Sequence, residues 1–125
     1  MSWFAAHEIE YFKVIKGKQD FFRVWENVYL IEAENSDEAW EKAERLSKEH
    51  QVDYKTSGIN GQPAKSVVAG IRKIVEVSHW EEKGVLRHAD EITYNEFNVS
   101  DERDVQKMMN GEPVKVEFLN LYSEK

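Results

Sequence analysis

Apolar and polar side chains alternate along the first third of the chain with a period of two, which is typical of β-strands. Residues 3–15 predict one strand and residues 21–33 a second, and Gly17 in the loop between them makes the pair a hairpin. One side of the second strand carries an apolar row that Glu26 interrupts: Phe22, Val24, Val28 and Leu30. Its other side carries Trp25, Tyr29 and Ile31. Because both sides are apolar, this strand is expected to be covered on both faces.

The pattern then changes to the period of a helix, which is predicted from Ser36 to His50. Apolar residues recur three and four positions apart and form one buried stripe: Ala39, Trp40, Ala43 and Leu46. Asn35 or Ser36 is expected to cap the first turn. The two acidic residues that follow favour the positive end of the helix dipole.

The second half of the chain predicts further strands and one more helix. Residues 51–65 are expected to form a loop, and the remaining elements follow it: strands over residues 66–80, 91–99 and 113–122, and a short helix over residues 101–109. In the strand over residues 66–80, Lys73 is expected to break an apolar row and Arg72 to point the other way. The row consists of Val67, Ala69, Ile71, Val75 and Val77.

The order ββαββαβ predicts one α+β domain over residues 1–125. Without its first strand this is the split βαβ unit. We therefore expect a ferredoxin-like, antiparallel-rich sheet with an extra N-terminal strand and two helices on one face. Apolar side chains on the opposite face then need another cover. We expect a homodimer formed through the sheet, in which a second subunit buries either the Trp25 side or the Leu30 side of the second strand.

Composition and charge limit the cellular compartment and the classes of binding partner that we expect. The chain has no cysteine, which excludes disulfides, thiolate catalysis and cysteine-bound zinc and fits a reducing cytosol. The N-terminus lacks the basic and apolar regions of a signal peptide, and no apolar stretch is long enough to span a membrane. A formal charge of −7 disfavours nucleic acid, whose phosphates are bound through Lys and Arg. We therefore expect a cytoplasmic protein whose partner is another protein.

Motifs predict no catalytic residue, metal site or cofactor. The four histidines lack the spacing of metal ligands, and there is no nucleophile motif or phosphate-binding loop. Glu26 stands out because it lies inside an apolar row. A carboxylate held against apolar surface has its pKa raised by desolvation, which is how acid–base groups are made. The alternative for Glu26 is an ion pair with Arg23 or Arg72.

A ligand pocket would use Glu26 together with a second carboxylate, Glu91. Its walls would be three tryptophans, with His79 beside the last of them: Trp3, Trp25 and Trp80. Core packing or a dimer interface accounts for the same tryptophans without a ligand.

Short motifs resemble those of one bacterial family. The start Trp3-Phe4-Ala5-Ala6 resembles a W-aromatic-A-A opening. Residues 25–33 resemble a "yE-x-v…ikA" strand. Residues 36–43 resemble the start of an "s-x-eEA-x-x-kA" helix. Asn60-Gly61 and Asp90-Glu91-Ile92 follow. Together they are similar to the DUF4288 family, small proteins of unknown function, over residues 3–97. The resemblance implies a shared fold but no activity or cofactor, and it marks four positions: Trp3, Glu26, Gly61 and Glu91.

Three functions are compatible with the sequence. The first, favoured by the missing nucleophile, ligand cluster and phosphate loop, is a non-enzymatic dimeric module for interaction or regulation. The second is a small-molecule-binding protein or enzyme that uses Glu26 and Glu91 in an aromatic-lined pocket. The third follows from charge alone: an acidic face that inhibits a basic toxin or nuclease.

Overall fold

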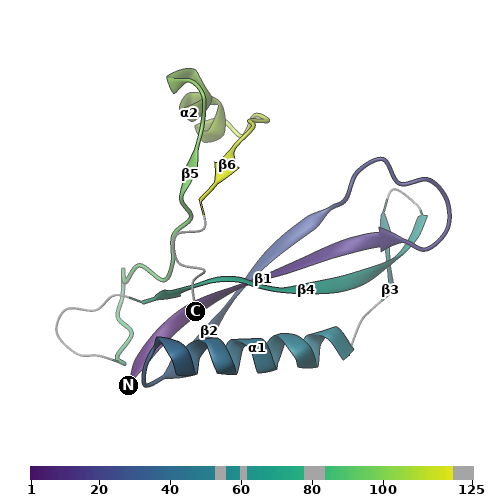
Figure 1. Cartoon of the computed structure of the whole chain (residues 1–125). Coiled ribbons are helices and arrows are strands. Elements are labelled where there is room, and N and C mark those ends of the chain that lie inside the picture. Colours follow the sequence, from purple (N-terminus) through teal and green to yellow (C-terminus); the bar gives the residue numbers. More distant parts are fainter. Residues whose placement is uncertain (53–55, 60–61, 78–83, 120–125) are drawn as a thin grey trace.

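Strand β1 (Ser2–Val14) lies at the centre of a four-stranded antiparallel sheet and is paired along both edges. Strands β2 (Val24–Ala33) and β4 (Gln62–Glu76) flank it, and the short β3 (Thr56–Ile59) pairs with the outer side of β4 (Figure 1). The strand order is therefore β2-β1-β4-β3. This computed structural model describes residues 1–52, 56–59, 62–77 and 84–119. The predicted α+β class is confirmed.

Helix α1 (Ser36–Val52) begins where the sequence predicts it. The side-chain oxygen of Asn35 accepts a hydrogen bond from the backbone N–H of Glu38 at 2.8 Å. The Glu38 carboxylate in turn accepts one from the backbone N–H of Glu34 at 3.3 Å. The first bond satisfies a donor that the first turn of a helix would otherwise leave unpaired, and the second binds the residue before the cap.

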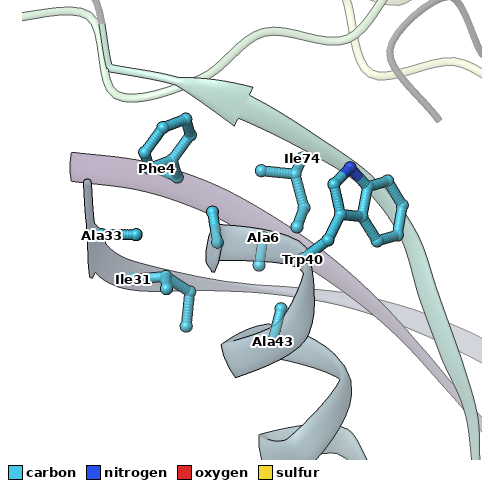
Figure 2. Close-up of a cluster of buried hydrophobic side chains, with 8 residues drawn as sticks. Phe4, Ala6, Ile31, Ala33, Trp40, Ala43 and Ile74 are labelled. Atoms are coloured by element: carbon cyan, nitrogen blue, oxygen red, sulfur yellow. The ribbon is translucent and has the colours of Figure 1, made fainter. Parts of the chain in front are cut away.

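The core lies between α1 and one face of the sheet. Figure 2 shows the buried side chains of α1 facing those of β1, β2 and β4. Ala39 and Ala43 have no exposed surface, so their small side chains let the helix approach the strands closely, and Trp40 fills the space beside them. The cluster consists of Phe4, Ala6, Ile31, Ala33, Ala39, Trp40, Ala43 and Ile74.

The position of α1 decides which face of β2 stays uncovered. Ile31 packs against the helix, so the side chains that alternate with it point to the other face, which we call the open face. Val24, Val28 and Leu30 lie there and are 53, 42 and 43 % exposed. Of the two alternatives left by the sequence, the Leu30 side is the one without a helix.

Strand β4 follows β1 with two irregularities. His7 pairs with Lys73 but Glu8 pairs with Ile71, so Arg72 is an extra residue, and Ala69 is extra in the same way. Between them Gly70 has a φ of +141°, a conformation that side-chain-bearing residues rarely adopt.

These bulges correct two predictions. Arg72 reaches the same face as Lys73 rather than the opposite one. The predicted single apolar row is also split, because Ile71 packs on the core beneath α1 whereas Val75 pairs with Ala5 on the open face.

The C-terminal part of the chain leaves the sheet. Strands β5 (Phe97–Asn98) and β6 (Glu117–Phe118) pair with each other, with α2 (Glu102–Met109) between them in sequence. Residues 97–118 form an arm that extends away from the sheet on the side opposite α1 (Figure 1). Within the described residues, no helix is long and apolar enough to cross a membrane.

This arm replaces the predicted ferredoxin-like arrangement. As far as the structure describes them, to residue 119, the strands predicted over residues 91–99 and 113–122 do not join the main sheet, and α2 does not lie beside α1. One physical reason is that the Lys73 side chain binds the backbone carbonyl of Tyr94, so this segment is held across the sheet by side chains rather than by a strand ladder. In addition, β3 forms within residues 51–65, which the sequence predicts as a loop.

Replacing Ser47 by Ala is expected to stabilise the fold. Ser47 is 3 % exposed, and its hydroxyl has no hydrogen-bond partner in the described part of the chain. An unpaired buried hydroxyl is costly and Ala is the better helix former, so the free energy of unfolding should rise by about 0.5–1.5 kcal/mol. Urea unfolding measures this, and Lys48→Ala at the exposed next position controls for helix propensity. A less stable Ser47→Ala variant would contradict the prediction.

Candidate functional site

His7 is completely buried in the middle of β1, on the open face of the sheet. Its Nδ1 atom lies 2.5 Å from Oε2 of Glu26 on β2, and its Nε2 atom lies 2.5 Å from the hydroxyl of Thr93. A carboxylate can only accept hydrogen bonds, so Nδ1 donates to Glu26 and Nε2 of the neutral ring accepts from Thr93. The three side chains thus form a chain from hydroxyl to imidazole to carboxylate.

Arg72 of β4 binds the carboxylate end of this chain. Its Nη2 atom donates to Oε2 of Glu26 at 2.8 Å and to Oδ1 of Asn95 at 3.2 Å. Its guanidinium also lies 4.9 Å from the ring centroid of Phe118 in β6. The structure therefore forms one of the two ion pairs that the sequence left open for Glu26, and it does so across the central strand.

Lys73 completes the group and is 1 % exposed. Its Nζ atom donates to the backbone carbonyl of Tyr94 and lies 5.4 Å from the centroid of that ring. Three consecutive residues, 93–95, are therefore fixed by three different side chains of the sheet. We call this group the His7 cluster: His7, Glu26, Arg72, Lys73 and Thr93.

Burial and charge set the protonation of the cluster. Burial lowers the pKa of His7. The hydrogen bond to Glu26 raises it by less, and the charge of Lys73 lowers it further. Burial alone would raise the pKa of Glu26, but the hydrogen bonds from Arg72 and His7 outweigh it and hold that pKa below its usual value. Burial and the charge of Arg72 lower the pKa of Lys73. At neutral pH His7 is neutral and Glu26 is charged.

Glu8 makes a separate pair on the opposite face of the sheet. This carboxylate is 2 % exposed and accepts a hydrogen bond from Nδ1 of His50, near the end of α1, at 2.9 Å. The ring of Tyr29 lies beside His50, with 5.2 Å between centroids. Burial and the charges of Glu8 and Glu10 raise the pKa of Tyr29. Adjacent residues of β1 thus carry His–Glu pairs on the two faces.

Two of the three tryptophans proposed as pocket walls, Trp3 and Trp25, do not converge. Trp3 and Trp25 lie on opposite faces of the sheet and near opposite ends of the β1–β2 hairpin. The indole N–H of Trp3 donates to the carbonyl of Gly84 at 2.8 Å. Trp25 packs edge-on against Phe12, with ring centroids 4.9 Å apart. Both therefore have packing roles.

The other residues predicted for a pocket with Glu26 are Glu91, His79 and Trp80. Glu91 is exposed, and no hydrogen bond or ion pair joins it to Glu26 within the described residues. His79 and Trp80 lie outside the residues that the structure describes. Two depressions of about 320 and 180 Å³ lie beside α1 and β4, and neither is lined by the His7 cluster. No group of three His, Asp or Glu side chains suited to a metal occurs in the described ranges.

Sequence reasoning found Glu26 and named Arg72 as one of its two possible ion-pair partners, but it missed the other members of the cluster. A usable signal exists for two of them, because His7 and Lys73 also interrupt apolar rows of their strands. The rows of His7 and Glu26 share one face, whereas the bulges of β4 divide the row of Lys73 between both faces. The predicted facing of Arg72 was wrong because its orientation depends on a bulge. Thr93 lies in a segment that the sequence predicts as a strand and that is irregular in the structure, so alternation does not give the facing of its side chain.

Acid is expected to destabilise the fold through His7. In the unfolded chain this histidine takes up a proton near its ordinary pKa of 6.5, whereas the folded protein holds that pKa lower. The contribution of neutral His7 to the stability of the fold is therefore fully present above pH 6.5, and it is lost as the pH falls below this value. For one proton, the free energy of unfolding decreases by up to about 1.4 kcal/mol per pH unit.

Urea unfolding between pH 7 and about 5 tests this dependence. His7→Gln cannot titrate at this position, so its stability should change less steeply with pH than that of the wild type. His88→Gln, at an exposed position, is the matched control and should keep the wild-type slope. Equal slopes in the wild type and His7→Gln would show that His7 does not carry the effect.

Comparison with known proteins agrees with the resemblance seen in the sequence motifs. Residues 3–86, about two thirds of the chain, match the family described as "Domain of unknown function (DUF4288)". The matched region contains all four strands of the sheet and α1, and it ends before Thr93 and the arm. No match is found among curated proteins or among solved structures. The chain therefore belongs to the DUF4288 family.

Proposed function

We propose that the protein is a cytoplasmic, non-enzymatic interaction module that forms a homodimer through the open face of its sheet. The observation that supports this proposal is the apolar row of β2. Val24, Val28 and Leu30 are each more than 40 % exposed on the face without a helix. Contiguous exposed apolar side chains, unlike scattered ones, are typical of protein interaction sites.

The row continues toward the hairpin that joins β1 to β2. Phe22 is 55 % exposed and packs edge-on against Tyr11, with ring centroids 6.1 Å apart. Aromatic residues are enriched at the centres of protein interfaces because they bury a large area at a low cost in conformational entropy. The apolar surface is thus long enough to accept the same row of a second copy.

The His7 cluster makes this face suitable for burial. Glu26 lies within the apolar row, and a free carboxylate there would oppose desolvation in a dimer. Hydrogen bonds from His7 and Arg72 already satisfy it, and its side chain is 22 % exposed. Little of its hydration remains to be lost when a second copy packs on the face.

Val28→Lys and Leu30→Lys are each expected to dissociate the dimer, because a lysine in the row would have to be buried without a partner. Light scattering coupled to size-exclusion chromatography measures the mass at micromolar concentration. The dissociation constant should rise by more than roughly tenfold. Gln51→Lys adds the same charge at an exposed position of α1 and should leave the dimer intact. A monomeric wild type would refute the proposal.

A second candidate function rests on the chain from Thr93 to Glu26. Thr93 is partly exposed whereas His7 is buried, so the hydroxyl is the member closest to solvent. We propose that His7 takes the proton of the Thr93 hydroxyl as the hydroxyl oxygen attacks the carbonyl carbon of an ester, while Glu26 stabilises the resulting imidazolium. The imidazolium then gives this proton to the alcohol oxygen that leaves as the ester bond breaks, and the acyl group stays on Thr93. Water would then release the acyl group and regenerate the hydroxyl. Glu91 has no part in this version.

Hydrolysis of p-nitrophenyl acetate tests this second function. Thr93→Val removes the hydroxyl and is expected to reduce the rate to that of buffer, whereas Thr93→Ser keeps a nucleophile and should retain activity. His88→Gln serves as the control for surface histidines that react with activated esters. Equal rates in the wild type and Thr93→Val would exclude Thr93 as the nucleophile.

A further inference from the structure

The arm over residues 97–118 is too small to be stable by itself. Helix α2 has eight residues, and none of them is buried. Isolated helices shorter than about 12 residues are marginal in water, and a two-stranded hairpin is marginal too. Among the described elements, α2 packs against no other helix or strand. Such an element gains its stability from a surface that it covers.

Helix α2 presents an apolar stripe for such a surface. Met108 and Met109 lie three and four positions after Val105, on one side of the helix, and the three side chains are 45 % (Val105), 38 % (Met108) and 78 % (Met109) exposed. Exposed methionines adapt readily to the shape of a partner. The stripe therefore has the character of a docking face.

The base of the arm keeps α2 away from its own sheet. Phe97 and Phe118 pack edge-on at 5.5 Å between centroids, and Phe118 lies against Arg72. From this anchored base the arm extends outward, and α2 stands apart from the hairpin end of the sheet (Figure 1). The surface that α2 covers is therefore not the hairpin end of its own chain.

The hairpin end, residues 13–23, has the complementary properties. Ile15, Phe21 and Phe22 are 57, 47 and 55 % exposed. Four basic side chains and one acidic one give this segment a formal charge of +3, on a chain whose net charge is −7: Lys13, Lys16, Lys18, Arg23 and Asp20. It is an apolar and basic site on an acidic protein.

The arm carries the opposite charge. Five acidic and three basic side chains give residues 97–118 a formal charge of −2: Asp101, Glu102, Asp104, Glu112 and Glu117 against Arg103, Lys107 and Lys115. Opposite charges that surround apolar contacts guide two surfaces together and select against wrong partners. The arm and the hairpin end match in both respects.

We propose that the arm of one copy docks on the hairpin end of a second copy, and that the contact is reciprocal. The inference rests on the homodimer proposed above and extends its interface. When two open faces pack about a two-fold axis that crosses the strands, the hairpin end of each copy lies toward the arm of the other. The apolar row of β2 in one copy then continues through Phe22 of that copy to the apolar stripe on α2 of the other copy.

Charge reversal in two separate variants tests the contact. The hairpin variant is Lys13→Glu with Lys16→Glu, and the arm variant is Glu102→Lys with Glu112→Lys. In each variant alone the dissociation constant of the dimer should rise by roughly tenfold or more. Sedimentation equilibrium at low salt measures it. Lys48→Glu, on the exposed side of α1, changes charge away from the contact and should have no effect. Circular dichroism checks that each variant is folded.

Mixing the two variants gives the decisive result. In a mixed dimer each arm meets a hairpin end of opposite charge, so the affinity should recover toward the wild-type value. No recovery would overturn the contact between copies. If Val28→Lys dissociates the dimer but both charge variants remain dimeric, the docking of the arm fails while the dimer through the open face stands. A monomeric wild type overturns both.

Discussion

Two ionisable side chains, His7 and Glu8, lie next to each other in the central strand, and both are withdrawn from water. A buried polar or charged group is tolerated only with partners, and strand geometry sends neighbouring side chains to opposite faces. Each face must therefore supply its own partner. Helix α1 brings His50 to Glu8 on one face, and residues 93–95 return along the other to meet His7. The layers on both sides of the sheet thus depend on one dipeptide.

Local signals account for what could be predicted. Alternation and Gly17 predict the β1–β2 hairpin, and Asn35 with the stripe of Trp40 predicts α1, because each feature acts within a few residues. The bulges of β4 arise from pairing with β1, so no pattern within β4 marks them. Strand-like alternation near the C-terminus says nothing of which strand it pairs with, and the arm was therefore missed.

The candidate site divides in the same way. Glu26 is visible in the sequence because it breaks an apolar row within its own strand. Its role depends on contacts that the sequence places far apart, since Thr93 meets a ring 86 residues earlier in the chain. The same contacts explain why an acidic residue is compatible with an apolar surface. The charge of Arg72 and the hydrogen bond from neutral His7 satisfy Glu26, and the same two side chains bind residues 93 and 95 of the C-terminal segment.

The paired bulges of β4 determine what a change in the length of this strand alters. At each bulge the extra residue is left out of the pairing, so the residues on both sides of it keep the facing that β1 sets. Loss of Arg72 alone would therefore remove a cation and make the ladder regular at this point, while Lys73 would still pair with His7 and Ile71 with Glu8. A change in strand length at a bulge thus alters the bend of β4 and the side chains that it presents, but not which residues face the core.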